Sequence, residues 1–320
     1  MPPNAPPANM SRTRSRLATS PAANRPEAIN QSNQAGTFRV WHAKAPSGRR
    51  PTPAGPLPVG RAPAGGGAVV ASFTVHDIAA GRFAVWSTAW LTGRSSYDEA
   101  LDVLLGETAH RVVGLPGTDE AVPLGWALSA LRGLGEQRLR LVLPVPGDTR
   151  GLPAVPELVA LGLEAGQAAV GSRLALVPEA LGPEAVSWTA VSLDGAPPVA
   201  PPVEGNLRAV SGALDLAVGD SARTLASLDL ARWNPEVPGL LAGLARTVHA
   251  PGLPADHDPV ALSVLGRAQR LSQVLDLAMA DAPGAAVTTA QAAARDEALR
   301  PLATAVREAT VAAYNWVPRG

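Results

Sequence analysis

The 320-residue sequence contains no cysteine, a single lysine and few aromatic residues. The lack of cysteine excludes disulfide bonds, thiolate metal sites and a cysteine nucleophile. Arginine supplies nearly all the positive charge, and with the many alanine, glycine and proline residues it indicates a GC-rich genome. We therefore do not take the arginines as evidence for phosphate binding. No apolar run reaches the roughly 18 residues that a transmembrane helix requires, so we expect no membrane insertion.

The net charge of zero hides an uneven distribution of charge along the chain. Residues 1–67 carry eight arginines and Lys44 against one acid, Glu27, so the remaining residues are acidic. An acidic folded part argues against a nucleic-acid-binding domain, because contacts to phosphate dominate such binding. We predict no specific nucleic-acid partner and interpret residues 1–67 as a disordered, basic tail rich in proline, glycine and alanine. A start of translation near Ala68 is an alternative explanation of this tail.

Residues 68–194 are expected to form a small α/β domain. Aromatic residues within 83–91 recur at helical spacing, which favours a helix there, although a strand is the alternative. By the same spacing we interpret Trp86, Trp90 and Trp126 as residues of the core.

A repeat of strand, loop and helix occupies the middle of this domain. Residues 111–131 and 141–161 match at a constant offset of 30, and each copy contains an apolar run, a Pro-Gly turn and an amphipathic helix. Further strands are predicted at residues 173–177 and 185–193, the second of them antiparallel and at an edge. The order strand, helix, strand, helix, strand, strand predicts a mostly parallel sheet with helices packed on it.

The C-terminal third is predicted to be helical. Residues 195–205 contain four prolines in two pairs and should form a stiff linker. Beyond it, residues 206–320 show helical periodicity throughout, with Asp258 as a predicted helix cap and Pro301 as a predicted kink. Short connections between long amphipathic helices predict an antiparallel helical bundle. The fold class is therefore α+β and rich in α-helix, in two parts.

The repeat also suggests a ligand site. If its two strands run parallel and side by side, both Pro-Gly loops open onto one crevice at the carboxyl ends of the strands. Free amides of helix N-termini would favour an anion there. The candidate ligand-binding residues are Thr118, Asp119, Gly147, Asp148, Thr149 and Arg150. The alternative is that these are ordinary turns, in which aspartate and threonine accept hydrogen bonds from nearby backbone amides.

Other motifs carry little chemistry. The sequence contains neither the GxGxxG pattern of dinucleotide-binding domains nor the GxxxxGK pattern, followed by Ser or Thr, of P-loop proteins. The run Asp256-His257-Asp258 has the residue types of a metal site, but a helix cap explains it more simply. We predict no metal and no cofactor.

Two functions fit these observations. The first is an intracellular, cytoplasmic protein that is not an enzyme and that interacts with a protein partner, or with itself, through its helical bundle. Alanine-rich helix faces support this hypothesis, because they allow helices to approach closely. The second is an enzyme or small-anion-binding protein that uses the two Pro-Gly loops.

Overall fold

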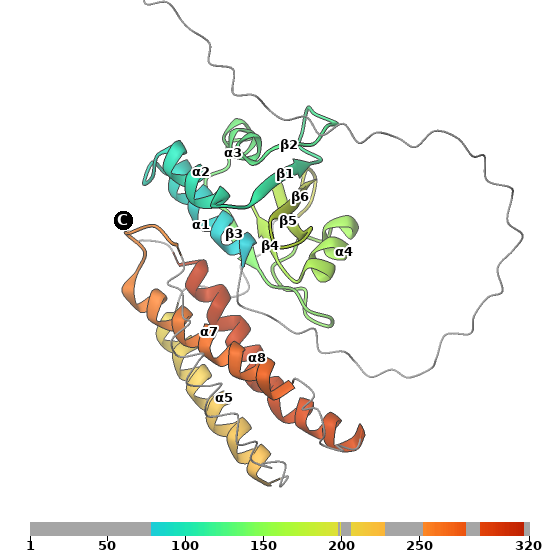
Figure 1. Ribbon diagram of the computed structural model, residues 1–320, viewed down its shortest axis with the longest axis vertical. Helices are drawn as coiled ribbons and strands as arrows, with labels where there is room; N and C mark the ends of the chain where they lie inside the picture. The colour runs from blue at the N-terminus through green and yellow to red at the C-terminus, as the bar shows by residue number, and fades with distance from the viewer. Residues whose placement is uncertain (1–77, 198, 200–205, 228–251, 280–288, 317–320) are drawn as a thin grey trace, which may run out of the picture. The chain divides into compact units, whose positions relative to one another are not determined.

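The structure is a computed structural model that describes residues 78–197, 199, 206–227, 252–279 and 289–316. The sequence pattern also predicts a strand or extended segment at residues 69–76 and a short helix capped by Asn234. Both lie outside these ranges, as do the basic tail and most of the linker. Within the described residues, a six-stranded sheet carries helices on both faces and is followed by three long helices (Figure 1).

The strands and helices alternate irregularly along the chain. The helices are α1 (Ala79–Leu91), α2 (Tyr97–Leu105), α3 (Leu124–Gly133), α4 (Pro156–Ala165), α5 (Leu207–Ser227), α7 (Pro259–Met279) and α8 (Thr289–Tyr314). The strands are β1 (Ala109–Val113), β2 (Val122–Pro123), β3 (Arg140–Val142), β4 (Ala168–Val170), β5 (Leu174–Ala180) and β6 (Ala185–Ser192).

The local signals in the sequence place several helices correctly. Residues 83–91 are helical, as the aromatic spacing predicts, and Trp86 and Trp90 are buried. The sequence places Ser96 before a helical segment as a predicted N-cap. Its hydroxyl accepts a hydrogen bond from the Glu99 amide at 3.1 Å, so it caps α2 as that pattern predicts. The assignment of Trp126 to the core is wrong, because its side chain is 58% exposed. The buried face of α3 is formed by its leucines, and Trp126 lies on the other side.

The sheet is mixed, and most of its pairings are antiparallel. Its strand order is β2-β1-β6-β5-β4-β3, and β1 with β6 is the parallel pair among these strands. The prediction of a mostly parallel sheet is therefore wrong. β6 does pair antiparallel with β5, as expected, but it lies inside the sheet because β1 covers its other side.

The strand β4 explains why the prediction of parallel neighbouring strands is wrong. The sequence pattern leads from α4 directly to β5, and a parallel crossover would then place β3 beside β5. Instead the short strand β4 lies between them and is antiparallel to both, so β3 and β5 share a direction without touching. Two of its three residues are alanine, a residue that is depleted in strands, so the sequence carries no signal for it.

Helices cover the two faces of the sheet with separate apolar layers. On one face, side chains of α1 and α3 pack on alternate residues of the strands, including Leu141, Leu176 and Trp188. On the other face, α4 packs on Val142 and Val177 with their neighbours.

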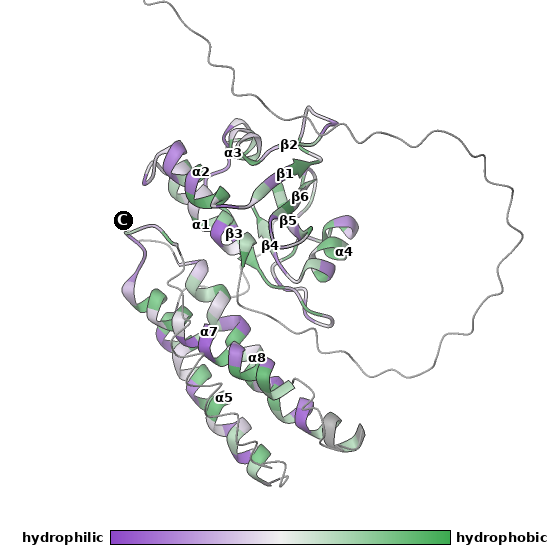
Figure 2. Cartoon of the chain, in the orientation of Figure 1, coloured by the Kyte–Doolittle hydropathy of each residue, from purple (hydrophilic) through white to green (hydrophobic). Residues whose placement is uncertain are grey.

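The C-terminal helices share the first of these cores. α8 packs against α5 and α7, and it also contacts α1 and β3. Buried side chains of α8 belong to the same continuous apolar cluster as those of α1. Along the long helices hydrophobic and hydrophilic residues alternate, as amphipathic packing requires (Figure 2). The described residues confirm a helical C-terminal part, whereas its antiparallel arrangement stays a prediction. No helix in the described residues has both the length and the apolar character to cross a bilayer.

Candidate functional site

The two Pro-Gly loops lie at opposite ends of the sheet. β1 runs parallel to β6, and three successive antiparallel pairings lead from β6 through β5 and β4 to β3. β3 therefore runs opposite to β1, and three strands separate the two. The loops that follow these strands, residues 114–121 and 143–155, consequently leave the sheet at opposite ends. The prediction that both loops open onto a common crevice is wrong.

The predicted site residues are accordingly divided between the two loops. Thr118 and Asp119 follow β1, whereas residues 147–150, which include Gly147, Asp148, Thr149 and Arg150, follow β3. Ligand binding by either group stays a prediction.

The two turns nevertheless have the same local structure. The Thr118 amide donates to the Leu115 carbonyl at 3.2 Å, and the Asp148 amide donates to the Val145 carbonyl at 2.9 Å. The intervening glycines have φ of 85° and 86°. A proline followed by a glycine at positive φ is the signature of a type II β-turn. The repeat with an offset of 30 residues therefore reflects real structural similarity at these two turns.

The residue that closes each turn also makes the same local hydrogen bond. The Thr118 hydroxyl accepts from the Glu120 amide at 3.3 Å, and the Asp148 carboxylate accepts from the Arg150 amide at 3.2 Å. Each side chain thus satisfies the backbone two residues further on, as the interpretation of ordinary turns expects.

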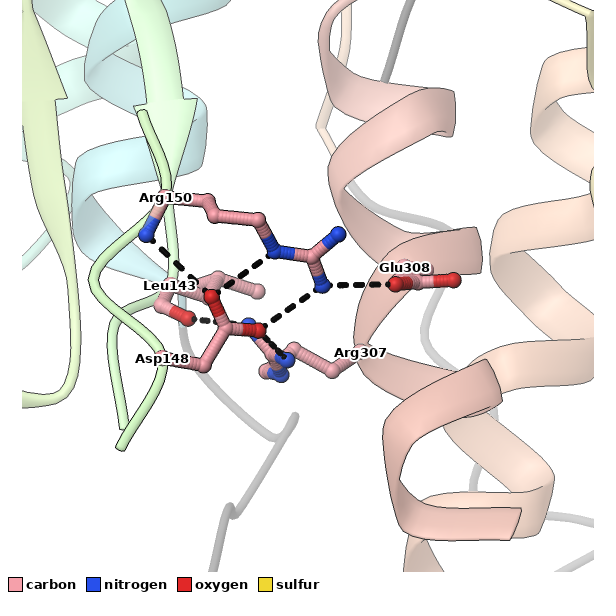
Figure 3. A network of polar contacts seen from close by, with 5 residues as sticks. All are labelled: Leu143, Asp148, Arg150, Arg307 and Glu308. Atoms are coloured by element: carbon pink, nitrogen blue, oxygen red, sulfur yellow. Dashed lines mark hydrogen bonds and ion pairs between the residues drawn. The ribbon is translucent and has the colours of Figure 1, made fainter. Parts of the chain in front are cut away.

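Beyond this bond, Asp148 lies at the centre of a four-residue ionic network that joins the turn to α8 (Figure 3). The Arg150 guanidinium donates two hydrogen bonds to the Asp148 carboxylate, at 2.9 and 2.8 Å, and a further one to the Glu308 carboxylate at 3.0 Å. Arg307 donates to Asp148 and also to the Leu143 carbonyl, the latter at 3.0 Å. Two cations and two carboxylates therefore balance one another across the contact between the turn and α8.

Burial within this network differs from residue to residue. The side chains of Asp148 and Arg307 are 19% and 11% exposed, whereas that of Arg150 is 59% exposed. The hydrogen bonds from Arg150, together with those from Arg307, hold the pKa of the Asp148 carboxyl well below its usual value of 3.8, although burial alone would raise it. The Asp148 carboxylate in turn raises the pKa of Arg150, with help from Glu308. Asp148 and Arg150 therefore both stay ionised over the whole physiological range of pH.

A second set of contacts to side chains follows the outer edge of β3. β3 ends the sheet, so every second residue directs its backbone groups away from the sheet. The Thr88 hydroxyl of α1 accepts from the Leu139 amide at 2.9 Å and donates to its carbonyl at 3.4 Å. The Asn315 amide, just beyond α8, accepts from the Leu141 amide at 2.7 Å and donates to its carbonyl at 2.9 Å. With Arg307 on the Leu143 carbonyl, side chains of two helices take the place of a neighbouring strand.

The sequence contains no pattern that singles out these partners. Thr88 lies in an ordinary helical segment and Asn315 follows another, and Arg307-Glu308 belongs to no recognisable motif. Their role depends on which strand lies at the edge, and the periodicity of a single strand does not record that position.

A buried carboxylate binds the connection between β4 and β5. Glu136, just after α3, is 2% exposed. It accepts hydrogen bonds from the backbone amides of Ser172, Arg173 and Leu174 at 2.9, 2.5 and 3.2 Å, and from the Ser172 hydroxyl at 2.8 Å. Its four donors come from one tight connection between strands, which indicates a structural role.

The residues of the Asp256-His257-Asp258 run point to different partners. Asp258 accepts from the first backbone amides of α7 at 2.7 and 3.0 Å and so caps that helix, as expected. Asp256 forms an ion pair with Arg94 at 2.8 Å. His257 is buried, its Nε2 lies 3.0 Å from the Ala313 carbonyl, and burial lowers its pKa. Among the described residues no group of three or more histidine or acidic side chains is arranged to hold a metal ion.

A small hollow of about 10 Å³, room for roughly one water molecule, lies between α1, His257 just before α7 and the end of α8. Arg94, Arg138, His257 and Asn315 line part of it. Arg138 donates to the Asn315 carbonyl at 2.6 Å. The hollow is therefore bordered by groups that hold these elements together.

Comparison with known proteins identifies the family of this chain. Residues 80–204 match the model of the Rv1486c-like protein N-terminal domain, and residues 208–311 match that of the Rv1486c-like protein C-terminal domain. No solved structure matches the chain.

Similar proteins occur in mycobacteria. "Uncharacterized protein Rv1486c" of Mycobacterium tuberculosis is 30% identical over 276 residues, which cover 73% of this chain and 94% of that protein. "Uncharacterized protein ML1804" of Mycobacterium leprae is 27% identical over 286 residues, which cover 73% of this chain and 95% of that protein. Both family models match, and the chain belongs to the Rv1486c-like protein family.

Proposed function

We propose that this protein is not an enzyme but an interaction protein, and that it acts through the outer face of α5 in its C-terminal helical part. The observation that carries the proposal is Leu216, whose side chain is 71% exposed, the largest value among the large apolar residues of the described chain. An apolar side chain so exposed gains about 1.5–3 kcal/mol when a partner covers it.

Small residues share this face with Leu216, and the exposed Asp220, paired with Arg223, lies one turn beyond it. Ala209, Gly212, Ala213 and Gly219 are exposed and lie at helical spacing from Leu216, so they share its side of α5. A Cβ atom added at either glycine would meet no atom of the described residues within 4 Å, so no described part of the chain packs there. Such a face admits a second helix at short distance, and a second copy of the same face is a sufficient partner.

The polar groups that suggested a ligand site support this proposal indirectly. Arg150, the candidate anion-binding residue, already bonds two carboxylates. These two carboxylates already balance its charge, which makes a role in holding α8 the simpler explanation of this arginine.

Sedimentation equilibrium of the full chain over a wide range of concentration tests the proposal. We expect concentration-dependent dimers that Leu216→Glu abolishes. A symmetric dimer loses the burial of both leucines, about 3–6 kcal/mol, so the dissociation constant should rise by at least about a hundredfold.

Leu181→Glu is the matched control. Leu181 is also exposed, at 47%, but lies in the connection between β5 and β6. The same substitution there should leave dimerisation unchanged. A chain that is monomeric at every concentration, or one that both variants affect equally, would refute self-association through α5.

A further inference from the structure

The helix α1 is buried on all sides along most of its length. Every residue from 83 to 90 is buried, a run of more than two helical turns. A helix that packs only on a sheet buries one face and exposes the other. One side of α1 does pack on the sheet, where the rings of Phe83 and Trp188 lie 5.0 Å apart between centroids. The opposite side therefore has a second cover.

The second cover of α1 comes from residues beyond the linker. The Trp86 indole nitrogen donates a hydrogen bond to the Gly252 carbonyl at 2.6 Å. The Tyr314 ring, at the end of α8, packs so closely on Gly81 that a Cβ atom there would lie 2.9 Å from it. α1 is therefore shared between the sheet and the C-terminal helices.

The last turns of α8 also lie against β3. Arg307, Val311 and Asn315 are spaced by four residues, so they share one face of α8 and its continuation. The first and last of them donate hydrogen bonds to the carbonyls of Leu143 and Leu141, at 3.0 and 2.9 Å. Val311 lies between them and is 3% exposed, so this face is buried over its whole length.

We infer that α1 and the outer edge of β3 form an intramolecular interaction surface, and that its partner is the segment 302–316 of the same chain. The parts that the two family models match, residues 80–204 and 208–311, consequently fold as one unit. The models divide the chain at the linker, but one apolar cluster continues across that division. Without segment 302–316 the sheet part would expose apolar side chains of α1 to water and leave the backbone groups of Leu141 without their partner.

Cutting the linker tests this inference with every native residue still present. A protease site is inserted within residues 200–205 of the full chain, and the protein is cleaved after folding. The substitution Leu216→Glu is present throughout, so that association through α5 does not hold the pieces together. We expect the two pieces to elute together from a sizing column. Pieces that separate, and that each keep a cooperative urea transition, would overturn the inference.

A charge on the buried face of α8 should release the pieces. Val311→Asp places a carboxylate against β3 and should weaken their association by about tenfold or more, because a buried charge without a partner is costly. Val260→Asp is the matched control, since Val260 is 52% exposed on α7. The control should leave the elution unchanged, and equal effects of the two substitutions would count against the proposed surface.

Hydrogen exchange on the unmodified, uncut chain provides a test that no variant can compromise. If the parts fold as one unit, the amides of β5 and β6 lose protection with the same free energy of opening as those of residues 306–311 in α8. Protection of β5 and β6 that persists after these α8 amides have exchanged would show that the sheet folds without them.

Discussion

Replacing Asp148 by asparagine should weaken the contact between the turn and α8 with little change in shape. The carboxylate bonds Arg307, which is 11% exposed, and Arg150, which is 59% exposed. A hydrogen bond to a charged, buried group contributes about 1.5–3 kcal/mol, whereas an exposed ion pair contributes at most about 1 kcal/mol. Arg307 retains the Leu143 carbonyl as a partner, so the free energy of unfolding should fall by about 2–3 kcal/mol.

Urea unfolding of the full chain, followed by tryptophan fluorescence, measures this loss. Glu308→Gln is the control, because Glu308 bonds only the exposed Arg150 among the residues of the network and should change stability by less than about 0.5 kcal/mol. A loss below about 0.5 kcal/mol for Asp148→Asn, or equal losses for both variants, would refute the assignment of the network's stability to the pair of Asp148 with Arg307.

The same variant has a defined dependence on pH. The folded-state pKa of Asp148 is held below the usual 3.8, so its contribution to stability is fully present above that pH. It is lost as the pH falls through the folded-state value. The difference between the native protein and Asp148→Asn should therefore be constant near neutral pH and should shrink below about pH 4.

Three further changes test the contacts that hold the fold together. Burial lowers the pKa of His257, so the unfolded state binds the proton first as the pH falls, and the urea midpoint should drop below pH 6.5. His257→Gln should reduce this drop. An equal drop in the variant would show that His257 does not cause it. Glu136→Gln should lower the free energy of unfolding by about 2–3 kcal/mol in urea, because one carboxylate serves four donors, and a neutral result would argue against that role. Gly81→Ala places a Cβ 2.9 Å from the Tyr314 ring and should lower the melting temperature. Gly212→Ala meets no atom of the described residues within 4 Å and should raise it; the opposite order would refute the packing of α1 on α8.

Local chemistry in the sequence predicted the elements better than their arrangement. The helices with clear caps or periodicity begin where expected, as Ser96 and Asp258 show. The direction of each strand could not be predicted, because an apolar run indicates which of its faces are buried but not which strand lies beside it. The alanine-rich β4 has no pattern that predicts a strand at all. Its position between β3 and β5 changes the pairing of half the sheet.

The candidate site shows the same division between local and long-range information. The type II turns at Pro116-Gly117 and Pro146-Gly147 and their local hydrogen bonds follow from residue types alone. The partners of Asp148 on α8 lie roughly 160 residues away in the sequence. Without an arrangement of the helices, the sequence offers no reason to connect Asp148 with Arg307 rather than with a ligand.

The two turns therefore separate what a motif specifies from what its position in the fold specifies. Both close with a side chain that bonds the backbone two residues further on, yet Asp148 alone also contacts α8. The difference arises because β3 ends the sheet and β1 does not, so only the turn after β3 lies beside the helix that covers the edge. Ionic bonds at the turn and the Asn315 amide on β3 then act on the same helix, and weakening either contact should loosen the other. A double-mutant cycle of Asp148→Asn with Asn315→Leu that shows strict additivity would mean that the two contacts hold α8 independently.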